Sequence, residues 1–184
     1  MRALTVVAVL GALVAAGAEP APKFSSESLY QLGSSFLDAT GKKVELSSLA
    51  GHPVLLSMVY TNCQATCPLT IARMKAIASK LDAKTKASAR FVLVSFDPKR
   101  DTPARLATVA KERALPAPAW VLLTGTDDAV RELAAALSFK YQPVEGGEFV
   151  HSTQLTVLGP DGVIRAQVSG DEATPEAAIQ AMQR

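Results

Sequence analysis

The sequence predicts an α/β domain with a mostly parallel central sheet, an antiparallel hairpin at the edge of that sheet, and flanking helices. Apolar runs of strand length occupy residues 53–60 and 90–96, and a segment with helical features follows each of them. A turn motif near the C-terminus joins two further strand-like runs. Strands separated by helix-length segments imply right-handed crossovers, so we expect parallel pairing in the centre of the sheet.

Length and charge limit the domain count and the partners. A chain of 184 residues is long enough for one domain with a complete hydrophobic core, so one folded unit is expected. Lys and Arg number 19 against 17 Asp and Glu. Because this surplus is too small to attract a polyanion, we exclude nucleic acid as a partner.

The first 18 residues have the features of a signal peptide. Met1 and Arg2 precede a short apolar stretch, which finishes in the small residues Ala16-Gly17-Ala18. This arrangement predicts cleavage after Ala18 and export to the periplasm or the extracytoplasmic face of the membrane. The alternative is an uncleaved membrane anchor, although the stretch is shorter than the ~20 residues that span a bilayer.

The folded domain is expected at residues 30–184. Residues 19–29 are rich in Pro, Ala, Ser and charged residues, and two prolines in this segment prevent regular structure, so it predicts a linker. Residues 44–49 then predict a short strand or a turn. The apolar run at residues 53–60 is bounded by turn-forming residues on both sides, as expected of a buried parallel strand.

The next segments continue the alternation of helix and strand. Residues 68–81 have apolar side chains at helical spacing, and Pro68 suits a first helical turn, where its missing N–H is not needed. A second buried strand is expected at residues 90–96. Thr102 is placed as an N-cap before a proline, so a helix should run from there to about Ala114, and we interpret Asp101 as part of this helix start.

The second half of the domain predicts the edge of the sheet. A Gly-Pro-Asp-Gly turn at residues 159–162 joins two strand-like runs and so indicates a hairpin. Thr174 before Pro175 indicates another N-cap. The expected elements are strands at residues 120–123, 152–158 and 163–168 and helices at 127–137 and from 175 onward. This order is a mixture found in thioredoxin-like α/β folds.

Two cysteines, Cys63 and Cys67, lie between the first buried strand and the helix that follows it. A loop exposes side chains there, and the helix N-terminus favours a thiolate over a thiol. A structural disulfide is one interpretation, since exported proteins form such bonds routinely. A bridge across so short a loop removes little chain entropy from the unfolded state, so we favour reversible thiol or metal chemistry.

The spacing of the cysteines favours a metal. Three residues separate them, whereas ordinary thioredoxin-type exchangers have Cys-x-x-Cys, and the wider loop presents two sulfurs to one ion. Thiolates are soft ligands that favour copper(I), and an added imidazole produces a site that also holds copper(II). The question is therefore whether a histidine is available.

The chain contains two histidines. His52 lies at the opposite end of the first buried strand from the cysteines, roughly 25 Å away at strand rise, so we discount it. His151 follows a Gly-rich loop at residues 145–148 and is expected to begin the fourth strand, facing the cysteine loop. Thioredoxin-like exchangers usually have a cis-proline at this place, and its absence here leaves room for an imidazole. His151 is therefore the candidate third ligand.

Several motifs occur in a fixed order along residues 36–170: Gly51-x-Pro53, Tyr60-Thr61-x-Cys63-x-x-x-Cys67-Pro68, Phe96-Asp97-Pro98-x-x-Asp101-Thr102-Pro103, Leu123-Thr124-Gly125, His151-Ser152 and Pro160-Asp161-Gly162. Together they resemble the Sco/SenC family of copper-binding, thioredoxin-like assembly factors for cytochrome c oxidase. By this resemblance Cys63, Cys67 and His151 are the ligands of a copper ion. The resemblance implies as partner the copper-site subunit of the oxidase, or another copper or thiol protein.

The family pattern also contains Asp97. This residue ends the second buried strand at the same edge of the sheet as the cysteine loop, so we interpret it as hydrogen-bonding or charge-balancing support for the site. Met58, Met74 and Trp120 fall in buried-strand or helix-face patterns and are expected in the core.

Three functions use these residues differently. A copper metallochaperone passes the ion to a partner by ligand exchange, with His151 completing the site. A thiol-disulfide reductase instead attacks a partner's disulfide through Cys63 and resolves the product through Cys67, which keeps the oxidase copper site reduced. A thiol peroxidase is the weakest reading, because its usual Pro-x-x-x-Thr-x-x-Cys signature does not surround either cysteine.

Overall fold

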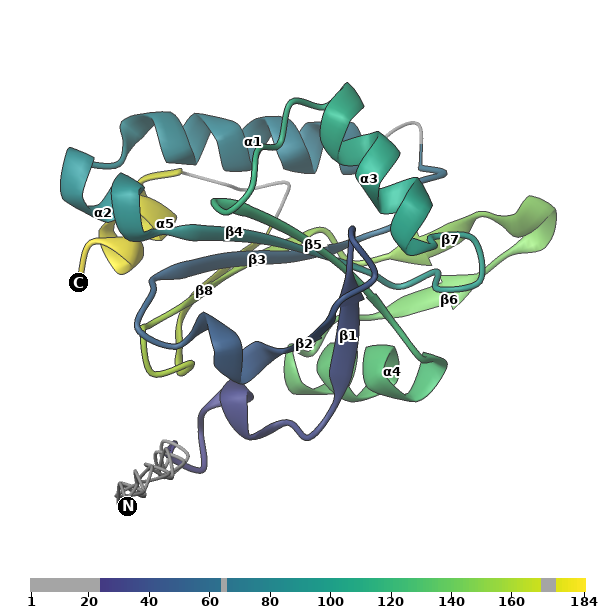
Figure 1. Ribbon diagram of the computed structural model, residues 1–184, viewed down its shortest axis with the longest axis horizontal. Helices are drawn as coiled ribbons and strands as arrows, with labels where there is room; N and C mark the ends of the chain where they lie inside the picture. The colour runs from purple at the N-terminus through teal and green to yellow at the C-terminus, as the bar shows by residue number, and fades with distance from the viewer. Residues whose placement is uncertain (1–23, 64–65, 170–174) are drawn as a thin grey trace, which may run out of the picture.

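Figure 1 shows a computed structural model of the chain, which describes residues 24–63, 66–169 and 175–184. One sheet has the strand order β2-β1-β5-β4-β3-β8-β9. Its strands are β1 (Ser35–Asp38), β2 (Lys43–Glu45), β3 (Val54–Val59), β4 (Arg90–Ser95), β5 (Trp120–Gly125), β8 (Gln154–Leu158) and β9 (Ile164–Ser169). The predicted signal peptide, most of the predicted linker and the predicted N-cap Thr174 lie outside the described residues.

The strand directions confirm the predicted α/β fold. The central strands β5, β4 and β3 pair in parallel, with Val54 of β3 opposite Arg90 of β4. The predicted hairpin of β8 and β9 continues the sheet beside β3 in antiparallel pairing. On the other side, β1 pairs antiparallel with β5, and β2 with β1; β1 was not predicted.

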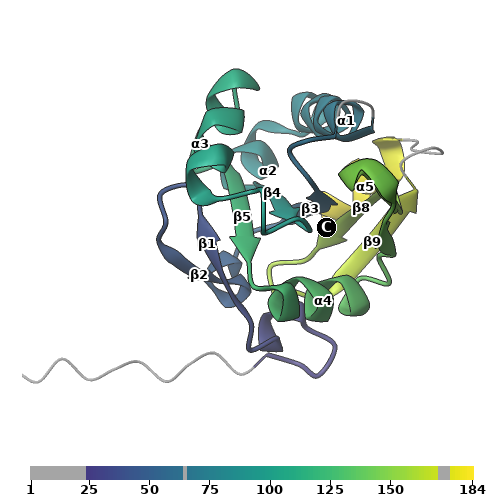
Figure 2. The ribbon, with the colours of Figure 1, turned by 90° about the vertical axis from the view of Figure 1, so that its right-hand side faces the viewer.

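Helices cover both faces of the sheet. Helices α1 (Thr66–Lys80) and α3 (Pro103–Glu112) lie on one face, whereas α4 (Asp127–Ala136) lies on the other (Figure 1, Figure 2). The short α2 (Ala83–Ser88) and α5 (Pro175–Met182) complete the set, and α2 was not predicted. Within the described residues, no helix is long and apolar enough to span a membrane.

The core forms where the two helix layers meet the central strands. All six residues of β3 are buried, and so are five of the six in β4. Such continuous burial is expected of strands with helices on both sides, because neither face then meets solvent. It explains why residues 53–60 and 90–96 form unbroken apolar runs in the sequence.

Three 3-10 turns and a second, two-stranded sheet complete the fold. The turns are η1 (Leu29–Gln31), η2 (Leu46–Leu49) and η3 (Glu145–Gly147), so the segment at residues 44–49 is a strand followed by a turn. Strands β6 (Tyr141–Pro143) and β7 (Phe149–His151) pair antiparallel on either side of η3. This β6–β7 hairpin extends from the end of the sheet where α1 starts (Figure 1).

Candidate metal centre

Two cysteines and a histidine from three separate segments come together at this end of the sheet. Cys63 follows β3, Cys67 lies in the first turn of α1, and His151 is the last residue of β7. One ligand atom from each residue lies within 4.8 Å of the other two. Bonds of ~2.0–2.3 Å to a common ion hold ligand atoms within about 4.6 Å of one another, so small side-chain rotations complete the site.

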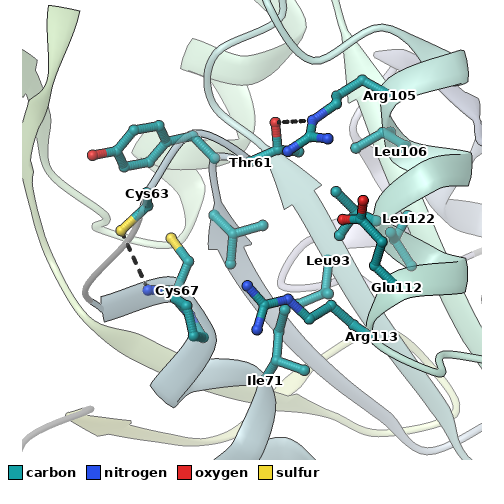
Figure 3. A pocket seen from close by; sticks show the side chains of 14 residues that line it. Thr61, Cys63, Cys67, Ile71, Leu93, Arg105, Leu106, Glu112, Arg113 and Leu122 are labelled. Atoms are coloured by element: carbon teal, nitrogen blue, oxygen red, sulfur yellow. Dashed lines mark hydrogen bonds between the residues drawn. The ribbon is translucent and has the colours of Figure 1, made fainter.

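The start of α1 controls the chemistry of the thiol pair. The Cys67 backbone N–H donates to Cys63 Sγ at 3.3 Å, as Figure 3 shows. The partial positive charge of the helix N-terminus also favours the thiolate form. Both side chains are shielded, with 8% of Cys63 and 6% of Cys67 exposed. The pair is therefore suited to act as a nucleophile or as soft metal ligands.

The β6–β7 hairpin carries His151 to the cysteines. The prediction that His151 begins the fourth strand of the sheet is wrong, because β8 begins at Gln154 and His151 pairs with Tyr141 of β6. The physical reason lies in η3, where Gly146 and Gly147 have φ values of +82° and +77°. Two successive residues in the left-handed region reverse the chain and allow β7 to pair back on β6.

Hydrogen bonding orients the His151 ring. Its Nδ1 lies 2.8 Å from the carbonyl oxygen of Ser152. Because a carbonyl oxygen only accepts, Nδ1 carries the proton, and Nε2 of the neutral ring has the lone pair that a metal ion requires. The Ser152 N–H donates to the Lys140 carbonyl at 2.8 Å, so the orienting group is itself held by the start of the hairpin.

Aromatic rings surround the imidazole. The ring centroids of Phe96, Tyr60 and Phe139 lie 5.1, 5.8 and 6.1 Å from that of His151. Phe149 also belongs to this cluster, with its ring centroid 5.1 Å from that of Tyr60 and 5.3 Å from that of Phe96. Close packing on several sides restricts rotation of the imidazole.

A phenol and a carboxylate pair beside the cysteines. The Tyr60 hydroxyl donates to the Glu148 carboxylate, which connects the end of β3 to the residue before β7. Burial, this hydrogen bond and the nearby Cys63 raise the pKa of Tyr60 far above its usual value. Tyr60 therefore stays protonated at neutral pH and remains a hydrogen-bond donor to the hairpin.

Asp97 contacts the hairpin through Arg100. The Asp97 side chain is buried, and its carboxylate pairs with the Arg100 guanidinium. Arg100 also donates to the Gly147 carbonyl and lies over the Phe149 ring, 5.7 Å from its centroid. We name these three contacts the Arg100 latch. Among the described residues, Asp97 is not one of the three whose ligand atoms converge. It contacts Arg100, which binds the hairpin that carries His151.

Asp101 fixes the segment that leads to Cys63. The predicted helix start is confirmed, with Thr102 as the N-cap of α3. The Asp101 carboxylate is fully buried and accepts the Thr61 backbone N–H at 2.9 Å, together with the Thr61 and Ser95 hydroxyls. The interpretation of Asp101 as only a helix-start residue is therefore incomplete, because Thr102 does the capping while Asp101 binds the ends of β3 and β4.

The other residues singled out in the sequence have structural positions. His52 lies at the far end of β3, as predicted, with Nδ1 at 2.8 Å from the Ser88 carbonyl oxygen and Nε2 at 3.2 Å from an Arg90 nitrogen. The residues expected in the core are buried there: Met58, Met74 and Trp120.

Sequence reasoning missed the hairpin and the Arg100 latch. A signal for the hairpin exists, because ring-bearing residues alternate on both sides of the glycine pair: Phe139 and Tyr141 before it, Phe149 and His151 after it. Alternation around a glycine turn is typical of a hairpin. The latch leaves no comparable signal, since its partners come from segments far apart in the chain.

Comparison with known proteins identifies the family. The family model described as SCO1/SenC matches residues 26–184. This chain belongs to the SCO1/SenC family. The family resemblance of the ordered motifs is thereby confirmed. The predicted thioredoxin-like α/β fold agrees with solved structures of Sco-family proteins.

Two relatives and one solved structure illustrate the likeness. The SCO1 protein homolog of Bacillus subtilis (strain 168) is 33% identical over 143 residues, which are 76% of this chain and 74% of the relative. The "Putative copper-binding protein" of Stutzerimonas stutzeri is 31% identical over 137 residues, 72% of this chain and 65% of that protein. The structure of BsSco, a member of the Sco family of cytochrome c oxidase assembly proteins, has a TM-score of 0.70 at 30% identity, covering 81% and 88% of the two chains.

Proposed function

We propose that this protein is a copper-binding metallochaperone that takes one copper ion on Cys63, Cys67 and His151. The observation that carries this proposal is the convergence of two sulfurs and one imidazole nitrogen within 4.8 Å. Two thiolates favour copper(I), and a thiolate–imidazole set also holds copper(II). The ligand types therefore fit copper in both oxidation states.

A three-ligand site suits a carrier. Three protein ligands leave a further position at which a ligand from a partner can bind the ion before the first ligands leave. His151 stands on a separate hairpin from the two cysteines, so the imidazole can leave or join while the thiolates stay in place. Copper transfer by stepwise ligand exchange follows from this arrangement.

The relatives support this proposal. One relative is named for copper binding, and BsSco belongs to a family of cytochrome c oxidase assembly proteins. We place the copper-site subunit of the oxidase, or another copper or thiol protein, as the recipient. We also place the protein outside the cytoplasm, with residues 1–18 as a cleaved signal peptide or an uncleaved anchor and residues 30–184 as the copper-binding domain.

Asp97 supports the proposed site indirectly, through Arg100. Its carboxylate holds Arg100, and Arg100 binds the hairpin that carries His151. Outer groups that orient ligands affect metal affinity and exchange, so we assign Asp97 a positioning role and no contact with the ion.

A thiol-disulfide reductase is the second candidate. The hydrogen bond from the Cys67 N–H to Cys63 Sγ favours this reading, because it stabilises Cys63 as an attacking thiolate. Cys67 lies four residues further along, in the first turn of α1, and is placed to resolve a mixed disulfide. The two functions share the cysteines, since copper requires thiolates and not a disulfide.

Copper titration of the reduced protein tests the proposal. We expect one copper(II) ion per chain, with a thiolate-to-copper charge-transfer band and a matching paramagnetic resonance spectrum. Cys63→Ala, Cys67→Ala and His151→Ala should each abolish this species. His52→Ala is the matched control, because it removes the other imidazole of the chain and should leave the titration unchanged.

The same variants separate the two candidates. His151→Ala should lose stable copper(II) binding yet reduce a small disulfide at nearly the normal rate, because the imidazole takes no part in the exchange of sulfur atoms. Absence of stoichiometric copper in the unmodified protein contradicts the carrier and leaves the reductase. Equal loss of copper binding in His52→Ala contradicts the assignment of His151.

A further inference from the structure

A small cavity opens beside the thiol pair, between α1 and α3. Its volume is about 50 Å³, and both cysteines line it. Figure 3 shows the two sulfur atoms at one end of the space and the side chains of α3 at the other. We name this cavity the α1–α3 slot. His151 is not among its lining residues, so the slot adjoins the thiol pair on a side that the imidazole does not line.

The walls of the slot are aliphatic. Ile71 from α1, Leu106 and Val109 from α3, and Leu93 and Leu122 from the sheet face the space. A water molecule needs roughly 10–15 Å³ of such volume, so the slot has the space of about three to five waters or of a small aliphatic group. An apolar group therefore fits it better than water does.

The rim of the slot is charged. Arg105, Glu112 and Arg113 project from α3 and the residue after it, giving two positive groups and one negative group. Arg105 donates through Nε to the Thr61 hydroxyl at 3.2 Å, so it is tied to the segment before Cys63. In Figure 3 the Arg113 side chain extends from the end of α3 across the slot toward α1. Arg113 is therefore the rim charge best placed to meet an incoming group.

We infer that the α1–α3 slot is a recognition pocket for a partner protein that presents an aliphatic side chain and an adjacent carboxylate next to its own cysteine. The aliphatic group fills the slot, Arg113 pairs with the carboxylate, and the partner's sulfur then lies at Cys63 and Cys67. The inference rests on the proposed function, because it names the partner chemistry of that site. The volume of about 50 Å³ suits a single side chain better than a whole organic ligand.

Charge complementarity argues for an acidic partner segment. Two guanidinium groups against one carboxylate leave a net positive rim directly beside a dithiol. An opposite charge beside an apolar pocket fixes orientation and raises the rate of encounter more than it raises affinity. Recognition should therefore appear in the rate at which a partner's sulfur reaches the protein's thiolate.

Thiol exchange with activated peptides provides that rate. Each probe is a short peptide whose cysteine is joined to 2-thiopyridine in a mixed disulfide. A protein thiolate attacks the peptide sulfur, a protein–peptide S–S bond forms, the peptide–pyridyl S–S bond breaks, and 2-thiopyridone leaves with the electron pair and takes up a proton. Absorbance of the released thione gives the rate. The Cys67→Ser protein keeps Cys63 as its single thiol and prevents further exchange.

Three probes of equal length separate the two contacts. The first places Leu and Glu after the cysteine, the second replaces Glu with Lys, and the third replaces Leu with Ser. We expect the Leu–Glu probe to react about five times faster than either of the others, the size expected for one exposed ion pair or one partly buried side chain. Dipyridyl disulfide, which is neutral and small, normalises every rate for the intrinsic reactivity of the thiol.

Variants assign the effect to the slot. Arg113→Glu should reverse the preference between Glu and Lys, whereas Arg113→Lys should keep it, and Val109→Phe should fill the slot and remove the preference for Leu over Ser. Arg131→Glu is the control, because Arg131 pairs with Asp128 on the opposite face of the sheet. Equal normalised rates for all three probes, or a preference unchanged in Arg113→Glu, overturn the inference.

Copper titration of the unmodified protein, set beside the probe rates of its Cys67→Ser form, keeps the two proposals distinct. A protein that selects the Leu–Glu probe without binding copper retains the slot inference and loses the carrier function. A protein that binds copper through its three ligands without selecting among the probes retains the carrier function and loses the slot inference.

Discussion

Removing the Arg100 guanidinium should open the β6–β7 hairpin more often. Arg100→Met keeps most of the aliphatic stem and deletes the charged group that pairs with Asp97, donates to the Gly147 carbonyl and lies over Phe149. These contacts connect the loop after β4 to the hairpin that carries His151. The variant therefore tests whether the latch holds the imidazole against the cysteines.

The size of the effect follows from the contacts. A hydrogen bond from a charged group contributes roughly 1.5–3 kcal/mol, and a cation–π contact about 0.5–1 kcal/mol. The Arg100 side chain is 40% exposed, so solvent screening reduces these values. A net loss of about 1.4 kcal/mol corresponds to a tenfold larger opening constant for the hairpin.

Amide hydrogen exchange measures this opening directly. The Ser152 N–H bonds the Lys140 carbonyl at 2.8 Å and the Val144 N–H bonds the Glu148 carbonyl at 3.0 Å, so both amides report on the hairpin. We expect both to exchange about ten times faster in Arg100→Met. Copper(II) release to a chelator should accelerate by a similar factor, because the imidazole must leave with the hairpin.

Copper affinity should change much less than these rates. The closed hairpin dominates in both proteins, so nearly all of the protein is in the conformation that binds copper. The rates of copper uptake and release therefore rise together, and their ratio, the affinity, changes little. Arg131→Met is the control, because it removes an exposed guanidinium that pairs with Asp128 on α4. Unchanged exchange at Ser152 and Val144 in Arg100→Met refutes the latch. Weaker affinity without faster exchange means that Arg100 acts on the copper site through its charge instead.

Three further perturbations test other contacts of the fold. Asp101→Leu leaves the Thr61 N–H without its buried acceptor and should lower the free energy of unfolding in urea by about 3 kcal/mol; an effect below about 1 kcal/mol contradicts the anchoring role. Gly147→Ala should accelerate exchange of the hairpin amides more than Gly146→Ala does, because both glycines have positive φ but only at Gly147 would a Cβ lie 2.9 Å from the Arg100 guanidinium. Hydrogen bonds from the Thr85 backbone and hydroxyl lower the pKa of Asp82 to about 2. The stabilisation that ionised Asp82 contributes is present above the unfolded pKa of ~3.9 and is lost as pH falls toward 2. In Asp82→Asn the free energy of unfolding should therefore fall less steeply over that interval of pH. The same pH dependence in both proteins contradicts this prediction.

Local patterns were enough for the main elements of the fold. The apolar runs at residues 53–60 and 90–96 became β3 and β4, because strands covered on both faces have no polar side to display. The cap at Thr102 is likewise a local interaction, between one side chain and the backbone that follows it. Such signals need no knowledge of distant segments.

The short elements escaped prediction for a physical reason. Strands β6 and β7 have three residues each and are held by their pairing with each other and by the aromatic cluster around His151. Three residues give too little periodicity to recognise, and the stabilising contacts come from distant parts of the chain. For this reason His151 was wrongly predicted to begin a strand of the main sheet, whereas it ends β7 of the hairpin.

The sequence by itself determined the family, the order of the main strands and helices, and the identity of the residues that converge at the candidate metal centre. Only the tertiary structure decided how they converge: a glycine turn brings His151 to the thiols, Asp101 fixes the segment before Cys63, and Arg100 holds the hairpin. Residue type carries ligand chemistry, which is local. Distance and orientation depend on contacts between segments far apart in the chain, which no local pattern records.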